Sequence, residues 1–233
     1  MPRQKLDFQM DTIKEDILRM TLLAEEQLRN AMTALSELDS KKAHDIIEKD
    51  KHVNELYAEI KERCIQTIAL QQPVAKDLRF ISISMDVATN LERIGDYAVD
   101  IAKNVNYILD ESPNISQEFN RHVLKLVDMN EGNKNPIMEM GEIAADMVNK
   151  AGPAFIHKDV GRIEEIHKME DNVDKLFAKV FRKLEEISRK DAEGMSFALN
   201  IILTARYLER IADHSVNIAH RTYYAMKAQE EFI

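Results

Sequence analysis

A twelve-residue sequence motif occurs twice in this chain, and this repeat constrains the fold more than any other feature. Residues 91–102 read LERIGDYAVDIA and residues 208–219 read LERIADHSVNIA, with eight identical positions and an offset of 117 residues. A second pair of similar segments supports the repeat, because residues 50–60 (DKHVNELYAEI) resemble residues 170–180 (EDNVDKLFAKV) at an offset of 120. The sequence therefore predicts two copies of one structural unit.

Apolar residues recur at steps of three and four along most of the chain, and no segment alternates as a β-strand would. This period is typical of amphipathic helices. Proline and N-cap signals divide the pattern into helices. The expected helices cover about residues 8–38, 40–70 and 73–110 in the first copy, and in the second one starts at Pro136 and two cover about 159–189 and 191–227. We predict an all-α fold of two tandem three-helix bundles related by the internal repeat.

Domain boundaries follow from the same pattern. The first repeat is expected at residues 1–113 and the second at residues 136–233. The segment 114–135 has no counterpart in the first copy, and its stretch QEFNRHVLKLVDM predicts a short extra helix. Gly152-Pro153 is expected to interrupt and kink the fourth helix, because a proline removes an amide donor from the helix interior.

Composition excludes several classes of function. The 233 residues carry a formal net charge of −9, and no basic stripe is available to neutralise a phosphate backbone, so nucleic-acid binding is not expected. The single cysteine, Cys64, forms no internal disulfide, which fits a reducing compartment. The N-terminus lacks the apolar core of a signal peptide. No apolar run approaches the roughly 18 residues of a membrane helix. We expect a cytoplasmic protein that is at most peripheral to a membrane.

In the repeated motif, apolar residues lie along one face of the helix, here called the seam, and acidic residues lie along another face. The seam residues step by three and four, and they are Leu91, Ile94, Ala98, Ile101, Val105 and Ile108 in the first copy and Leu208, Ile211, Ser215 and Ile218 in the second. The acidic row is spaced i, i+4, i+8 and consists of Glu92, Asp96 and Asp100, with Glu209, Asp213 and Asn217 in the second copy. Acids at this spacing lie roughly 5–6 Å apart and repel one another. We expect them on the outer face of each bundle.

The preceding helix of each copy supplies oxygen side chains of its own. Asp50 and Asn54 are spaced i, i+4, and so are Glu170 and Asp174. If the two helices are antiparallel neighbours, four oxygen-bearing groups meet at one groove in each half. Such groups favour magnesium, manganese, calcium or iron over structural zinc. The alternative is a solvated face whose acids pair with Arg93, Arg210 and Lys103.

Other chemical signals in the sequence are weaker. Glu164-x-x-His167 is half of the di-iron carboxylate signature, but no second copy stands at an equivalent place. Cys64 lies on the apolar seam of its helix without a His/Asp partner pattern, so we expect a buried core residue. His214 and His220 are expected on different sides of their helix. No glycine-rich phosphate loop occurs.

The stretches QPVAKDLRFI (72–81), NLERIGDYAVDIAKN (90–104) and ARYLERIADHSVNIA (205–219) resemble the PhoU family of phosphate-signalling proteins. The resemblance covers nearly the whole chain outside residues 114–135. It implies two three-helix bundles and, as in some members, iron or zinc clusters held on the bundle surface by Glu/Asp-x-x-x-Asp motifs. The ten positions above match those motifs, although Asn54 and Asn217 are neutral where the family often has an acid.

The same resemblance implies regulation and not catalysis. PhoU-like proteins act beside the phosphate-specific ABC transporter and a membrane sensor histidine kinase, and they restrain phosphate uptake and the starvation response when phosphate is plentiful. We further expect a homodimer, since most soluble oligomers are symmetric. Two alternatives stay open: a ferritin-like di-iron protein and a helical scaffold without any metal.

Overall fold

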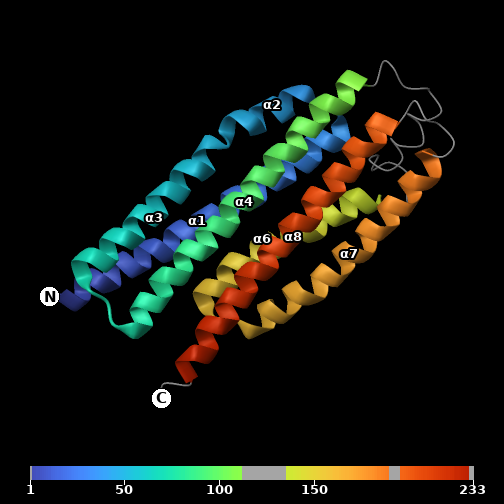
Figure 1. Cartoon of the computed structure of the whole chain (residues 1–233). Helices are drawn as coiled ribbons and strands as arrows, with labels where there is room; N and C mark the ends of the chain where they lie inside the picture. The colour runs from blue at the N-terminus through green and yellow to red at the C-terminus, as the bar shows by residue number, and fades with distance from the viewer. Residues whose placement is uncertain (1, 112–134, 189–194, 231–233) are drawn as a thin grey trace.

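The computed structural model describes residues 2–111, 135–188 and 195–230. The regular structure in these ranges is entirely helical, which confirms the all-α prediction (Figure 1). The first repeat contains α1 (Pro2–Glu37), α2 (Ser40–Lys49), α3 (Lys51–Gln71) and α4 (Ala75–Glu111). The second contains α6 (Pro136–His157), α7 (Val160–Ser188) and α8 (Met195–Glu230). The extra helix predicted within segment 114–135 lies outside the described residues.

The first hairpin of each repeat is built from the same local signals. The residues after α1 and α6 are Leu38 and Lys158, and both take the left-handed conformation, with φ of 49° and 54°. A left-handed residue closes a helix end by pairing its last carbonyl groups. An aspartate follows in each case, and Asp39 and Asp159 accept hydrogen bonds from backbone amides at the start of the next helix. The repeat is therefore visible in backbone geometry at an offset of 120.

Two sequence predictions about the first repeat need correction. Helix α1 begins at Pro2 and not near residue 8. The single helix predicted at 40–70 is two helices, because a break at Asp50 separates α2 from α3. Asp50 itself has helical torsions (φ −54°, ψ −32°), and its carbonyl accepts hydrogen bonds from the amides of both Val53 and Asn54. The break is therefore a bend over one residue, which the apolar period does not reveal.

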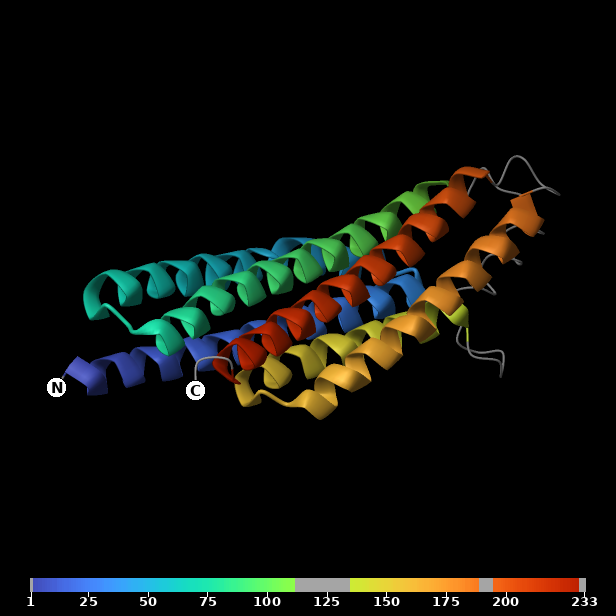
Figure 2. The same cartoon turned by 60° about the horizontal axis from the view of Figure 1, so that its bottom comes forward.

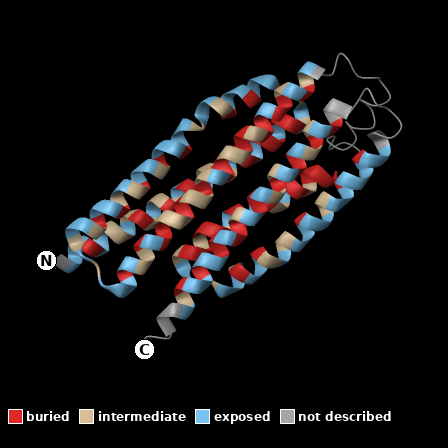
Figure 3. Ribbon diagram, viewed as in Figure 1, coloured by how far each residue is buried: buried red, intermediate tan, exposed pale blue. Residues whose placement is uncertain are grey.

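The central layer of the molecule pairs the two repeats with each other. Helix α4 packs along α8, and α1 packs along α6, while α2–α3 and α7 cover opposite sides of this layer (Figures 1 and 2). The seam residues predicted on α4 and α8 are all buried, and so is Cys64. Buried residues, red in Figure 3, occur on the helices of both repeats. Their apolar side chains form one hydrophobic core. The two bundles thus share one core.

The predicted interruption at Gly152-Pro153 is wrong, because α6 continues through both residues to His157. Gly152 instead lies at the contact between α6 and α1. A Cβ on Gly152 would lie 2.1 Å from Thr21 Oγ1, so the glycine is what lets the two helices approach. About three helical turns away along α6, a Cβ on Gly141 would lie 2.7 Å from Met32 Cε. Gly141 follows Thr21 by 120 residues, and Gly152 follows Met32 by 120 residues. The two contacts are therefore exchanged by a pseudo-two-fold axis.

The α4–α8 contact has the same pseudo-two-fold symmetry. His214 Nδ1 lies 2.8 Å from Asn90 Oδ1, and the rings of Tyr97 and Tyr207 stack with centroids 5.8 Å apart. At the offset of 117, Tyr207 corresponds to Asn90 and His214 corresponds to Tyr97. Each pair is thus the symmetry mate of the other. His214 faces α4 whereas His220 faces α7, where it contacts a ring of that helix, which confirms that the two histidines point to different sides.

Candidate functional site

The ten candidate ligands all lie at the surface, half-buried or exposed, as predicted. In the first repeat, α3 and α4 are antiparallel neighbours (Figure 1). Asp50, at the α2–α3 bend, lies close to the acidic row of α4, since a Cβ on Gly95 of α4 would lie 3.8 Å from Asp50 Oδ1. Burial raises the pKa of Glu92, and the charges of Asp96 and Asp50 raise it further. Burial also raises the pKa of Asp96, with contributions from Asp50 and Asp100 against the lowering effect of Arg93. The first acidic site therefore brings these carboxylates within electrostatic reach of one another.

Cationic and amide partners partly satisfy the first site. Arg93 donates to Asp96 at 3.0 Å, and Lys103 donates to Asp100 at 2.9 Å. Asn54 donates from Nδ2 to Asp50 Oδ2 at 2.7 Å, so its amide already serves a neighbouring candidate ligand. Two of the cations named in the metal-free alternative, Arg93 and Lys103, are therefore in place here.

The second acidic site lies between α7 and α8 and is less well neutralised. Partial burial raises the pKa of Glu170, Glu209 and Asp213. Asp174 adds to each of these rises, and Asp213 adds to those of Glu170 and Glu209. These charge contributions mean that carboxylates repel one another across the two helices.

Partners are scarcer at the second site. Arg206 donates to Glu209 Oε1, but Glu209 Oε2 is buried without a hydrogen-bond partner. Asp174 and Asp213 are exposed and have no hydrogen bond or ion pair within the described ranges. Within the described ranges, Arg210 forms no ion pair with these acids, as the metal-free alternative would require, and its guanidinium lies over the ring of Tyr97, 5.6 Å from the centroid. An orphaned carboxylate oxygen beside unpaired acids suits a cation better than the first site does.

Two histidines adjoin the second site, and sequence reasoning gave them no role. The rings of His167 on α7 and His220 on α8 lie 4.8 Å apart between centroids. His167 Nδ1 lies 3.9 Å from Glu170 Oε2, and both histidines lower the pKa of Glu170 against the effect of its acidic neighbours. Each histidine stands three residues from a candidate ligand, Glu170 or Asn217, and this i, i+3 spacing is the signal that could have found them.

Neither acidic site forms a complete coordination sphere for a metal ion. Among the residues that the structure describes, no three His, Cys, Asp or Glu side chains form a group that could hold a metal ion. The carboxylates interact through their charges but are not gathered around one point. Cation binding at the ten positions therefore stays a prediction.

The di-iron signature points away from the bundle interior. Glu164 is exposed and His167 is half-buried on the outer side of α7, where it contacts His220 and not a core carboxylate. Ferritin-like sites instead project their ligands inward from facing helices. The geometry of these two residues does not favour the ferritin-like alternative.

Comparison with known proteins identifies the fold and its repeat. The family model for the PhoU domain matches residues 17–105 and matches again at residues 137–222. The chain belongs to the PhoU family. The double match confirms the internal repeat, and every candidate ligand falls inside a matched PhoU range. The exact boundaries predicted at 113/114 and 135/136 stay predictions.

Relatives and solved structures agree with this assignment. The chain is 30% identical over 231 residues to the Phosphate-specific transport system accessory protein PhoU homolog of Clostridium acetobutylicum, covering 99% of this chain and 98% of that protein. It is 28% identical to the PhoU protein of Escherichia coli K12, covering 95% and 85%. The crystal structure of PhoU from Pseudomonas aeruginosa superposes with a TM-score of 0.82 at 28% identity, over 95% of this chain and 99% of that one.

None of the helices within residues 2–111, 135–188 and 195–230 combines the length and the apolar character that crossing a bilayer requires.

Proposed function

We propose that this PhoU-family chain is a regulator of phosphate uptake and of the phosphate-starvation response. The observation that carries the proposal is the similarity over essentially the full length to accessory proteins named for the phosphate-specific transport system. The regulator acts by binding, from the cytoplasmic side, to the phosphate ABC transporter, to the sensor histidine kinase, or to both. A bound regulator shifts the equilibrium of its partner only as far as it prefers one partner state over the other.

The two acidic sites supply a cation-dependent element for this regulator. At the second site, the charges of Asp174 and Asp213 add to the raised pKa values of Glu170 and Glu209. The charge of Asp174 also raises the pKa of Asp213, and a cation would relieve this repulsion. The corresponding first site offers Asp50, Glu92, Asp96 and Asp100 but shares them with Arg93 and Lys103. The second site is therefore the stronger candidate for a divalent cation.

Deletion of the gene is expected to release phosphate uptake and alkaline phosphatase expression in phosphate-rich medium. Because coupling between two states of a regulated protein typically changes an equilibrium 5–150-fold, we expect an increase on the order of tenfold. Alkaline phosphatase activity and labelled-phosphate uptake in the deletion strain would measure it. A plasmid copy of the gene should restore repression, whereas unaltered repression in the deletion strain would contradict the proposal.

The histidine pair predicts a difference in metal preference between the two sites. Imidazole nitrogen is a good ligand for zinc and a poor one for magnesium. A His167→Ala, His220→Ala variant is therefore expected to bind Zn²⁺ about tenfold more weakly, or weaker still, with Mg²⁺ binding unchanged. Calorimetric titration with each ion measures this, and His44→Ala on exposed α2 is the control. Equal Zn²⁺ affinity in the variant and the wild type would show that the pair contributes no ligand.

A further inference from the structure

One end of the first repeat, here called the tip, consists of residues 3–14 at the start of α1 and residues 70–79 around the α3–α4 connection. Figures 1 and 2 both show these two segments side by side at the end that carries the N-terminus. Arg3 links them, because its guanidinium Nη1 lies 2.6 Å from Asp77 Oδ2. The tip is therefore one region of the molecule, although its two segments are distant in sequence.

The tip carries the most exposed apolar side chains in the part of the chain that the structure describes. Leu70 is 75% exposed, Val74 69% and Phe8 68%, and no other large hydrophobic residue of the described ranges reaches these values. Single exposed apolar residues are common on protein surfaces, but several of them at one place mark an interaction site. The tip is therefore a candidate for contact with a partner that offers an apolar phase.

The tip is also basic, although the whole chain has a formal net charge of −9. Its two segments contain five lysine or arginine residues and three aspartates. The aspartates pair with Arg3 and Lys14, which leaves the exposed Lys5 and Lys76 for other partners. A basic region on an otherwise acidic protein directs an anionic partner to that region.

A pocket of about 420 Å³ opens at the tip between α1, α4 and the end of α6. Lys14, Lys76 and Lys158 line it, one from each of these three segments, together with the aspartates that already have cationic partners. Burial lowers the pKa of Lys158, and the charges of Lys76 and Lys14 lower it further. Positive charges therefore repel one another here, and an anionic group among the lysines would relieve the repulsion.

The fold itself does not require a lysine after α6. At the offset of 120, Leu38 of the first repeat corresponds to Lys158. Both residues have left-handed torsions, with φ of 49° and 54°, and Leu38 packs against the core. An apolar residue therefore closes the equivalent helix end, and the positive charge of Lys158 is not needed for that purpose.

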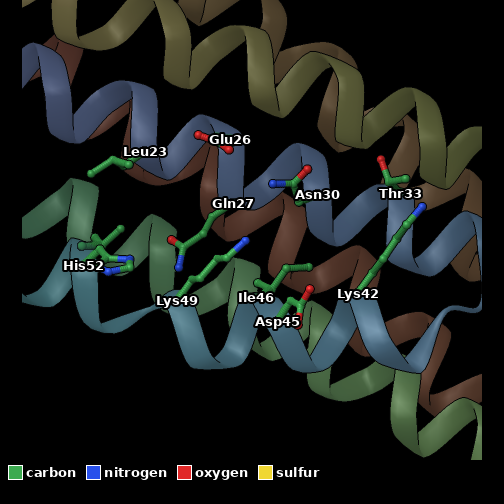
Figure 4. A pocket seen from close by; sticks show the side chains of 11 residues that line it. Leu23, Glu26, Gln27, Asn30, Thr33, Lys42, Asp45, Ile46, Lys49 and His52 are labelled. Carbon is green, nitrogen blue, oxygen red and sulfur yellow. The ribbon is translucent and has the colours of Figure 1, made fainter.

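The larger pocket of the first repeat has no comparable excess of positive charge. It has a volume of about 490 Å³ and lies between α1 and the α2–α3 segment (Figure 4). Figure 4 shows two lysines at this pocket, Lys42 and Lys49. Two acids, Glu26 and Asp45, line it as well, and Lys42 also pairs with Glu37. This balance of charges does not favour an anion, so the lysines of α2 are suitable controls for those of the tip.

We propose that the tip binds the surface of a lipid bilayer that contains anionic phospholipids. The phosphate group of a lipid headgroup enters the pocket and accepts charge-assisted hydrogen bonds from Lys14, Lys76 and Lys158. The three most exposed apolar side chains of the tip enter the boundary between headgroups and acyl chains. Binding of this kind combines burial of apolar surface with the attraction of basic residues to anionic lipids. It does not depend on the regulatory function proposed above.

Sedimentation of the full chain with protein-free vesicles tests this, using phosphatidylcholine alone and phosphatidylcholine mixed with phosphatidylglycerol. The buffer contains EDTA, so that the result does not depend on the acidic sites. We expect binding to the anionic vesicles to be at least about tenfold stronger than to the neutral ones, and to weaken as salt is added. Equal binding to both vesicles would overturn the proposal. So would binding only to membranes that carry proteins, which would assign the tip to a protein partner.

Variants at exposed positions locate the contact without disturbing the core, and circular dichroism confirms that each one is folded. A Lys76→Glu, Lys158→Glu variant is expected to bind anionic vesicles about tenfold more weakly, or weaker still, because two attractive charges become repulsive. A Val74→Ser variant should also bind more weakly, because it loses apolar burial. A Lys41→Glu, Lys49→Glu variant, with the same change of net charge on exposed α2, is the matched control and should bind as the wild type does. Wild-type binding by both tip variants would refute the proposed surface.

Discussion

A Gly152→Leu variant is expected to lose about 1–3 kcal/mol of its free energy of unfolding. The α6 backbone passes so close to α1 that even a Cβ would lie 2.1 Å from Thr21 Oγ1 and 2.9 Å from Thr21 Cβ. Leucine favours a helix over glycine by up to about 1 kcal/mol, but the overpacking of a shared core outweighs that gain. Urea unfolding followed by circular dichroism measures the change.

Two further variants separate helix approach from a general effect of leucine. Gly161 is exposed near the start of α7, where an added Cβ meets only Asp159, so Gly161→Leu should leave stability nearly unchanged. Thr21→Gly combined with Gly152→Leu removes the opposing side chain and should recover part of the loss. If Gly152→Leu unfolds at the wild-type urea concentration, the two helices separate at little cost and the close contact is not essential.

The second large effect is expected at the acids between α7 and α8. An Asp174→Ala, Asp213→Ala variant removes two exposed carboxylates that have no partner within the described ranges. Loss of two oxygen ligands should weaken binding of a divalent cation at least about 100-fold, because even residues that only orient the ligands change affinity 10–100-fold. Titration with Mn²⁺ and Zn²⁺, together with elemental analysis, measures the loss.

The control for this variant is Asp171→Ala, which removes an exposed acid on the same helix that is not among the charges raising the pKa of Glu170, Glu209 or Asp213. It should keep the affinity and stoichiometry of the wild type. Equal metal content in all three proteins would remove the second site, and the metal-free scaffold would then describe this half of the molecule.

The wild type and the Asp174→Ala, Asp213→Ala variant can also be compared without metal, through the pH dependence of their thermal stability. The pKa values of Glu170, Glu209 and Asp213 are raised in the folded chain above their ordinary values of 4.5, 4.5 and 3.8. A folded state that holds these protons more tightly than the unfolded state loses stability as pH rises through the raised values. In EDTA, the wild-type Tm should therefore fall as pH rises above about 4.5, and the double variant should show a shallower fall. Identical slopes would show that the repulsion is negligible.

Local signals in the sequence were sufficient for the helices and for their repetition. Asp39 and Pro136 marked helix starts that the structure contains, and the apolar seam on α4 is buried as its period predicts. The bend at Asp50 was not predictable in this way, because Asp50 keeps helical torsions and the apolar period continues through it. Its position depends on how α2 and α3 pack on α4 and α1, which is information from tertiary structure.

The candidate ligands illustrate the same limit. The i, i+4 spacing placed the acids on the correct outer face, but it did not show that Arg93 and Lys103 occupy the first site more fully than Arg206 occupies the second. His220 was missed because the ring that it contacts, that of His167, belongs to a different helix. Only the packing of helices distant in sequence brings such residues together.

The exchange of Thr21–Gly152 with Met32–Gly141, and of Asn90–His214 with Tyr97–Tyr207, has a consequence for the ancestry of the chain. A single three-helix ancestor that self-associated about this axis would already have presented the same helix faces to each other. Gene duplication and fusion would then have required no new interface between the two halves. Once fused, the two halves were free to diverge, and Gln27 and Lys49 of the first repeat now correspond to Met147 and Met169 of the second.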